Sequence, residues 1–542
     1  MTRLRRVDLA AALVTLLLAW LVIYPIVIVG AEASNGAAIR AFVTRPGEWA
    51  ALWASVWISL VSVILAAAIG IPLAFLFEWF DFPGRKTLGS LIALPVVLPP
   101  LVGVIAFLFL YGESGFIARA IQAALHLENA PWRLQGAAAI LLVHAYSMYV
   151  YFYLFMRAGL AKLDVSMLEA AQALGADRAS TLWRVIVPLL RPSLIGAAIL
   201  TFMTALGSFS APYIFGGGFR VMTTQIVATK LNGDLPLAMV ETVALAIVAI
   251  VGLLILRRTE GDDILVALGK GIAPRPRPIR RTGVRRLATV AGWGLAVLLL
   301  LPHLTLILVS LVPYGAWTTE ILPPVINFEN YRRLFSEAER LRPMWNSFWM
   351  AAVSTALAVV LALVGGWLVV RRRVALRRAI EGLLALPWAL PGTVFAIALA
   401  TTFSVRAPFA LRFVLVGTAV LLPLAYLVRA LPLTGRGILA SYRQLDPSLE
   451  EAAASLGAGR WRTLARVTLP QLRPGLAAGA SLALVAGLGD IVASIVLYTY
   501  ETRPVSIEIL SSLRLDETGV AAAFGVVLMI VSAIVLGVGA RR

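Results

Sequence analysis

Two polar segments of this chain carry the same chemically useful residues at the same spacing. The first, EAAQALGADRASTLWRVIVPLLRP, begins at Glu169, and the second, EAAASLGAGRWRTLARVTLPQLRP, begins at Glu451. A carboxylate can pair with a basic residue of another protein, and small residues beside a glycine corner let a partner approach closely. The pattern therefore predicts a protein-docking site in duplicate. An amphipathic helix lying on a membrane surface would explain one such segment, but not identical spacing in two.

Each segment is expected to form a short helix, a glycine corner and a second amphipathic helix that ends at a proline. Glycine commonly follows a helix C-terminus because it reaches the left-handed conformation cheaply, and Asp164 and Asp446 can cap the two helix starts. The predicted docking residues are Glu169, Ala170, Ala171, Gly175 and Pro188 in the first copy and Glu451, Ala452, Ala453, Gly457 and Pro470 in the second.

A second set of oxygen-bearing side chains lies in strongly apolar stretches. Ionisable groups in such stretches are costly, so each is a functional hypothesis. Asp490 follows Gly489 in a deep apolar setting and is the first candidate, and Ser208 stands at the matching place in the first copy. A structural carboxylate paired with a neighbouring helix is the alternative for Asp490. Tyr146 and Tyr149 are further candidates, with packing or an interfacial belt as their alternative; Glu241 and Glu508 complete this set.

Catalytic chemistry has no support in the sequence. There is no cysteine, and the three histidines are scattered without metal-ligand spacing. No G-x-x-x-x-G-K-[ST] sequence occurs, so no phosphate-binding loop is expected. We therefore expect neither an enzyme nor a resident cofactor, and whether the apolar part binds a metal ion stays open.

The elements that carry these residues are membrane spans. Of 542 residues, 60% are hydrophobic and 14% are charged, with a mean hydropathy of +0.89. Apolar runs of about 20 residues, enough to cross a bilayer as a helix, recur along the chain. The first run is too long for a signal peptide and is taken as a retained span. We expect an all-α polytopic membrane protein with about twelve spans, near 9–29, 51–77, 88–111, 134–157, 193–215, 238–256, 288–312, 347–370, 380–403, 411–431, 475–497 and 519–539.

The net charge of +19 is a topology signal rather than a sign of nucleic-acid binding. Outside these spans, the segments on the same side as the N-terminus hold 31 Lys and Arg residues and the segments on the other side hold 13. The richer side is cytoplasmic by the positive-inside rule. Both chain termini and both docking segments are therefore expected in the cytoplasm.

Further repeats divide the chain into two halves. ALPVVLPP at 93–100 recurs as ALPWALPG at 385–392, and LGSFSAPYI at 206–214 recurs as LGDIVASIV at 488–496. An even number of spans per half gives two repeats of parallel orientation. We expect a first half at 1–256, a basic, Pro- and Arg-rich cytoplasmic linker at 257–287, and a second half at 288–542.

The duplicated segments resemble the Glu-Ala-Ala loop of ABC importer permeases, and the fused arrangement resembles the ferric-iron permease family. The resemblance implies a type I importer permease fold, in which each loop seats in a cleft of a separate ATPase subunit that binds ATP. It implies two ATPase copies, a periplasmic or lipid-anchored solute-binding protein, a bacterial inner membrane and alternating access. Arg220 and Arg503, at matching outer positions, would then contact the binding protein or an anion travelling with iron, or else be solvated.

Ferric iron is the solute that this resemblance favours, and hard oxygen ligands would suit it. Relatives of that family carry thiamine, 2-aminoethylphosphonate and polyamines, so these solutes and sugar phosphates stay open. A secondary transporter is the alternative of a different class, because such proteins also use repeats and broken helices. It would not need the duplicated docking loops.

Overall fold

The three-dimensional structure is a computed structural model that describes residues 2–258, 276–279, 281–316, 322–404 and 414–540. Helices dominate it, as expected for a chain that must satisfy its backbone hydrogen bonds inside a bilayer. The elements of the first half are, in order, α1 (Thr2–Glu32), α2 (Gly36–Thr44), α3 (Pro46–Trp79), β1 (Phe80–Asp81), α4 (Arg85–Leu91), η1 (Leu94–Val97), α5 (Pro100–Tyr111), α6 (Phe116–Leu125), α7 (Gly136–Leu160), α8 (Val165–Ala173), α9 (Arg178–Thr181), η2 (Leu182–Ile186), α10 (Val187–Leu206), α11 (Ser210–Phe215), α12 (Met222–Leu231) and α13 (Leu235–Arg258).

The second half repeats this order of elements. They are β2 (Arg277–Pro278), α14 (Thr282–Ser310), α15 (Glu329–Ser336), α16 (Ala338–Gly366), η3 (Trp367–Arg371), α17 (Arg377–Ala385), η4 (Leu386–Ala389), α18 (Gly392–Thr402), α19 (Leu421–Gln444), α20 (Pro447–Ser455), α21 (Arg460–Thr463), η6 (Leu464–Thr468), α22 (Leu469–Leu488), α23 (Val492–Leu497), α24 (Val505–Arg514) and α25 (Thr518–Ala540).

Membrane spans account for most of these helices. Among the described residues, nine helical segments are long and apolar enough to cross a membrane, or ten if the bent pair 377–402 is one span. Helices α19 and α22 are not among them, yet they pack along α16 as α7 and α10 pack along α3. Counting these two gives two sets of six, so the predicted polytopic, twofold-repeated all-α fold is confirmed.

Two predicted spans are broken rather than continuous. The stretches predicted at 88–111 and 380–403 are both interrupted at their ALP repeats, and the helices on either side of the second break meet at a bend of 107°. Proline has no N–H to donate and disfavours helical backbone in the residue before it. Leu98 before Pro99 and Leu390 before Pro391 accordingly have extended ψ angles of 124° and 141°.

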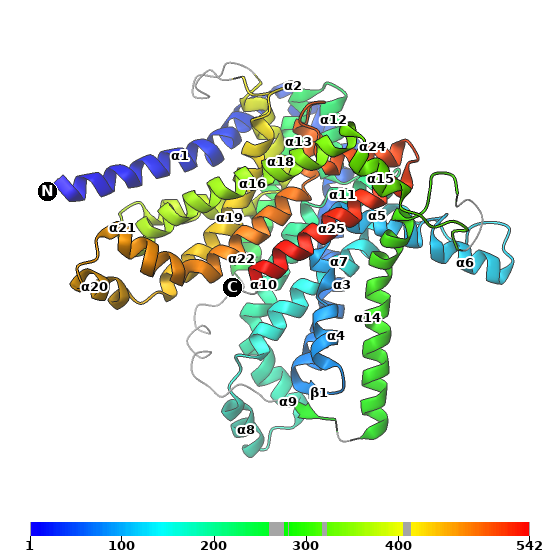
Figure 1. Ribbon diagram of the computed structural model, residues 1–542, viewed down its shortest axis with the longest axis horizontal. Coiled ribbons are helices and arrows are strands. Elements are labelled where there is room, and N and C mark those ends of the chain that lie inside the picture. Colours follow the sequence, from blue (N-terminus) through cyan, green and yellow to red (C-terminus); the bar gives the residue numbers. More distant parts are fainter. Residues whose placement is uncertain (1, 259–275, 280, 317–321, 405–413, 541–542) are drawn as a thin grey trace.

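The two halves form helix bundles that diverge from one another (Figure 1). Helices α3, α7 and α10 run down toward α8, whereas α16, α19 and α22 run obliquely toward α20 (Figure 1). We call the end of each bundle that carries α8 or α20 the loop end, and the opposite end, near α11, α12 and α24, the far end. The first helix of each half crosses over: α1 packs mainly on α17 and α18, and α14 packs on α5 and α25.

Matching hydrogen bonds show that the halves fold alike. The Ser55 hydroxyl accepts from Met222 N at 2.7 Å, and Ser347, 292 positions later, accepts from Val505 N at 2.8 Å. The carbonyls of Ser208 and Asp490 likewise accept from Thr223 and Ser506, both at 2.7 Å. Residues of α3 therefore correspond to those 292 positions later, and residues of α12–α13 to those 283 positions later.

The predicted linker at 257–287 lies largely outside the described residues. Its described part includes β2, which pairs in parallel with β1 through Phe80 with Arg277 and Asp81 with Pro278. This pairing holds the end of the linker against the turn that follows α3. The half boundaries at 256 and 288 stay predictions.

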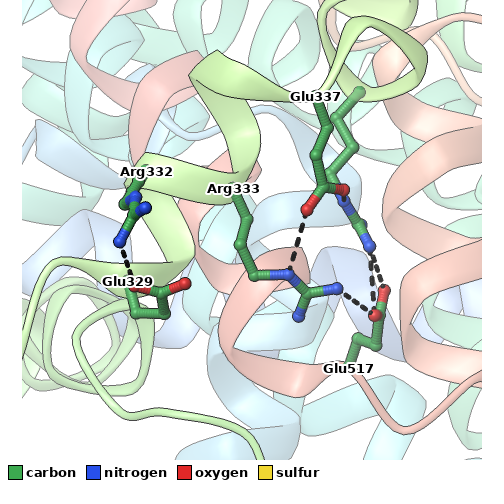
Figure 2. Close-up of polar contacts among 6 residues, drawn as sticks. Glu329, Arg332, Arg333, Glu337 and Glu517 are labelled. Atoms are coloured by element: carbon green, nitrogen blue, oxygen red, sulfur yellow. Dashed lines mark hydrogen bonds and ion pairs between the residues drawn. The ribbon is translucent and has the colours of Figure 1, made fainter.

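An ion-pair network fastens α15 to the start of α25 at the far end of the second half (Figure 2). Glu517 accepts from Arg333 at 2.8 Å and from Arg340 at 3.0 Å, and Glu337 bonds to both arginines. Burial alone would raise the pKa of Glu517, but these hydrogen bonds outweigh burial and lower it. The hydrogen bond from Arg340 is the main cause that lowers the pKa of Glu337.

Replacing Glu517 by Gln is expected to lower the free energy of unfolding by about 1.5–3 kcal/mol, since hydrogen bonds to charged groups contribute about that much. Because the folded pKa lies below the ordinary 4.5, this contribution is present above pH 4.5 and is lost as pH falls below it. Thermal midpoints of the purified protein between neutral and acid pH measure both effects. Glu329→Gln is the control, because its pairing with Arg332 at 3.8 Å is exposed (Figure 2). Equal midpoints for both variants would contradict the assignment.

Candidate functional site

The two predicted docking segments adopt the same structure at the two loop ends. Asp164 caps α8 by accepting from Ser166 N at 3.0 Å, and Asp446 caps α20 by accepting from Ser448 N at 2.9 Å. The latter hydrogen bond lowers the pKa of Asp446. Helix, corner and second helix follow in both copies as the sequence predicts.

The glycine corners are left-handed and open to the surroundings. Gly175 has φ +84° and Gly457 has φ +78°, and an added Cβ at either would meet no described atom within 4 Å. The N–H of Ala176 bonds to the carbonyl of Ala171, and that of Ala458 to that of Ala453, both at 3.0 Å. This six-to-one bond closes each helix in a Schellman motif. Space therefore remains beside each corner for another protein.

Two leucines at these corners were missed by the sequence reasoning. Leu174 is 89% exposed and Leu456 is 88% exposed, and each directly precedes its glycine. The glutamates of both copies are also exposed. A single exposed apolar residue is common, but equal exposure at the matching corner of both copies favours a shared contact surface. The recurrence of Leu-Gly in both copies was the available signal.

The turns that lead back into the bundles are widened at equal places. Five-residue π-helical segments, η2 and η6, occur just before Pro188 and Pro470. A proline removes one backbone hydrogen bond and its ring crowds the carbonyl four residues earlier, which accounts for the wider turn. In the second half Glu450 also accepts from Thr468 at 2.8 Å and pairs with Arg371 at 3.4 Å. The second docking segment is thus tied to η3 of its own bundle.

Ser208 and Asp490, the first candidates among the oxygen-bearing side chains and the ones expected to line a translocation path, lie where the two halves meet. Each follows a helix end at a glycine, Gly207 after α10 and Gly489 after α22. An added Cβ at Gly489 would come within 2.6 Å of Pro99 Cβ, and one at Gly207 within 3.6 Å of Pro391 Cα. The repeated ALP breaks of one half therefore contact the glycine ends of the other.

Asp490 is buried and has a charged partner that the sequence did not reveal. Its side chain is 3% exposed and accepts from Arg429 of α19, whose side chain is 37% exposed. The other carboxylate oxygen caps α23 by accepting from Ala493 N at 2.7 Å. The carboxylate is thus both paired with a neighbouring helix and placed beside the interface between halves.

Ser208 belongs to a neutral chain at the equivalent place of the first half. Its hydroxyl lies 2.9 Å from His144 Nε2, and His144 Nδ1 lies 2.8 Å from the Ser62 hydroxyl. The position that matches Arg429, 282 residues earlier, is Ser147. The charged pair of the second half is therefore absent from the first.

The remaining candidates are placed as follows. Tyr146 donates to Leu299 O at 2.7 Å and Tyr149 to Ile92 O at 2.5 Å, so both hydroxyls bond to neighbouring helices.

The two arginines predicted for the outer side both lie at the far end. Arg220 is exposed there and donates to Gln225 at 3.2 Å. Arg503 pairs with Glu508 at 2.9 Å. In the described ranges no group of three or more His, Asp or Glu gathers as a metal site.

Comparison with known proteins identifies the family of this chain. A profile of the family described as "Binding-protein-dependent transport system inner membrane component" matches residues 41–259 and again residues 354–541. The probable ABC transporter permease protein y4fN of Sinorhizobium fredii is 29% identical over 498 residues, which cover 91% of this chain and 87% of that protein.

Two further relatives have named solutes. The ferric transport system permease protein FbpB of Actinobacillus pleuropneumoniae is 26% identical over 81% of this chain and 63% of its own length. The thiamine transport system permease protein ThiP of Escherichia coli is 29% identical over 82% of this chain and 81% of its own length. With two family matches that together cover more than half of its residues, the chain belongs to the inner membrane components of binding-protein-dependent ABC transport systems, as a fused permease of two halves.

Proposed function

We propose that this chain is the translocating subunit of an ABC importer whose two loop ends each dock one ATPase subunit. One observation carries the proposal: two glycine corners of equal geometry, each flanked by a glutamate and a leucine that are open to the surroundings. ATP is bound by the partner subunits, in line with the lack of a phosphate-binding loop in the sequence. Closure of the ATPase pair brings the two loop ends together and rocks the bundles about the contacts of Gly207 and Gly489 with the opposite half.

The loop ends lie on the cytoplasmic side in this proposal, with both chain termini. The membrane is a bacterial inner membrane, and the far end faces a solute-binding protein. Arg220 and Arg503 are the proposed far-end contacts, supported by their matching positions. Reversing both charges should raise the concentration of binding protein that half-saturates uptake.

Ferric iron is the proposed solute. The named ferric permease among the relatives supports it, and thiamine is the runner-up for the same kind of reason. 2-Aminoethylphosphonate, polyamines and sugar phosphates remain within the class. The charged Asp490 beside the interface between halves offers an oxygen ligand of the type that hard cations prefer.

Uptake in proteoliposomes tests both levels of the proposal. The chain is reconstituted with its ATPase and binding protein, and entry of labelled ferric iron is compared with entry of thiamine and 2-aminoethylphosphonate. Iron uptake that requires ATP supports the full proposal. ATP-driven uptake of an organic solute alone would overturn the iron assignment, and ion-driven uptake without any ATPase would indicate a secondary transporter.

A further inference from the structure

Two glutamates are buried together at the far end of the first half. Glu48, in the first turn of α3, is 4% exposed, and Glu241, in α13, is 0% exposed. Gln225 and Thr229 lie one turn apart on α12, so their hydrogen bonds bring the two carboxyl groups to the same face of that helix. One oxygen of each has a donor: Glu48 Oε1 accepts from Gln225 at 3.2 Å, and Glu241 Oε1 accepts from Thr229 at 2.8 Å.

The second oxygen of each carboxyl group has no such donor. Glu48 Oε2 and Glu241 Oε2 are both fully buried and without a hydrogen-bond partner among the described residues. Burying one unpaired carboxylate is costly, and two in contact also repel one another. The pair therefore requires a positive charge between or beside its free oxygens.

In the second half, the position that matches Glu48 carries the opposite charge. The residue that matches Glu48, 292 positions later, is Arg340, and the residue that matches Glu241, 283 positions later, is Phe524. Arg340 bonds to Glu337 and Glu517 in the network drawn in Figure 2. A guanidinium thus occupies the position that a carboxylate takes in the first half.

A charge count makes the difference quantitative. Three arginines and three glutamates balance in the second half, namely Arg333, Arg340, Arg503, Glu337, Glu508 and Glu517. The matching first-half positions are Ala41, Glu48, Arg220, Arg45, Gln225 and Asp234. Together with Glu241 they hold two positive charges, on Arg45 and Arg220, and three negative charges, on Glu48, Asp234 and Glu241. One positive charge is missing from the first half.

The charged neighbours do not supply it. Asp234, in the turn before α13, is paired with Arg45 at 3.8 Å. Arg220 is exposed and donates a hydrogen bond to the amide oxygen of Gln225. Gln225 and Thr229 of α12 are neutral, and Lys230 of the same helix donates instead to Val496 O at 2.8 Å. None of these side chains therefore compensates the charge of the carboxyl pair.

We propose that Glu48 and Glu241 bind one monovalent cation, a shared proton or a sodium ion, which replaces the charge that Arg340 provides in the second half. Oxygen donors from two carboxyl groups suit either hard cation. The bound cation holds the start of α3 against α13 at the far end. The proposal does not depend on which solute is transported.

The test measures the thermal midpoint of the purified chain in nanodiscs of zwitterionic lipid. In one arm, sodium replaces choline at constant ionic strength and at about pH 9, where a buried glutamate pair can lose its proton. In the other arm, pH falls from about 9 to about 6 in choline without sodium. A rise of about 2 °C or more is expected. A rise in the first arm assigns sodium, and a rise only in the second assigns the proton.

Glu241→Gln removes one charge while keeping the shape, and is expected to abolish the response in both arms. Glu48→Gln serves as a second variant should the first fail to fold. Glu508→Gln is the matched control, because Glu508 occupies the place of Gln225 in the second half and pairs with Arg503; it should keep the wild-type response. No response of the wild-type chain in either arm, or a wild-type response in Glu241→Gln, would overturn the proposal.

Discussion

Tryptophan at Gly175 and Gly457 is expected to lower ATP-driven uptake by about tenfold or more while the complex still hydrolyses ATP. A docking loss of only about 1.4 kcal/mol gives a tenfold change. The bulky side chain would fill the open space beside each corner, where no described atom of the chain lies within 4 Å. The chain itself should therefore tolerate it, and the ATPase subunit should not.

Backbone strain must be separated from this steric effect, because a non-glycine residue in the left-handed region costs about 1–2 kcal/mol. Gly233→Trp is the matched control: it has φ +86°, is equally open, and lies at the far end between α12 and α13. Because the proposed binding protein also meets the far end, this control is read at the ATPase: Gly233→Trp should bind the ATPase subunits as tightly as the wild type does, and the Gly175 and Gly457 variants should bind them more weakly. Normal uptake with intact solute-stimulated ATPase activity in the Gly175 and Gly457 variants would show that the docking assignment is wrong.

Asp490→Asn is expected to lower uptake several-fold while the complex still assembles. Asparagine keeps the oxygen that caps α23 through Ala493 N, but it removes the charge that neutralises Arg429. Breaking a fully buried ion pair costs about 3–5 kcal/mol, and the 37% exposure of Arg429 reduces this. Uptake and thermal midpoint are measured together.

A double variant separates a role in transport from a role in stability. Arg429→Ser with Asp490→Ser gives the second half the serines that the first half carries at 147 and 208. Its thermal midpoint should recover toward that of the wild type, because no charge is left unpaired. Its uptake should stay low if the charged pair acts on the solute. Full uptake in the double variant, or unchanged uptake in Asp490→Asn, would remove Asp490 from the path.

Local features of the docking segments were predictable because they depend on short stretches of sequence. The aspartate caps and the glycine corners followed from residues within a few positions of one another, and their recurrence 282 positions later supported both. The breaks at 88–111 and 380–403 could have been inferred from their prolines. They were missed because long apolar composition was given more weight than proline spacing.

Features that depend on packing between distant helices were not predictable. Asp490 and Arg429 are 61 positions apart and meet only because α22 and α19 pack together. The scattered histidines gave no sign of a partner, yet His144 bridges Ser62 and Ser208 and so links three helical segments. Glu48 fell outside the predicted spans and gave no local sign that it would be buried against Glu241.

Cross-linking tests the central claim, that each loop end docks an ATPase subunit, most directly. The chain has no cysteine, so a single cysteine can be placed at Leu174 or at Leu456, labelled with a photoactivated cross-linker and assembled with the ATPase. Each site is expected to cross-link to an ATPase subunit, whereas a cysteine at Leu231, which is 71% exposed at the far end, should not. An assembled, ATP-hydrolysing complex that cross-links at neither Leu174 nor Leu456, or as strongly at Leu231, would contradict the account.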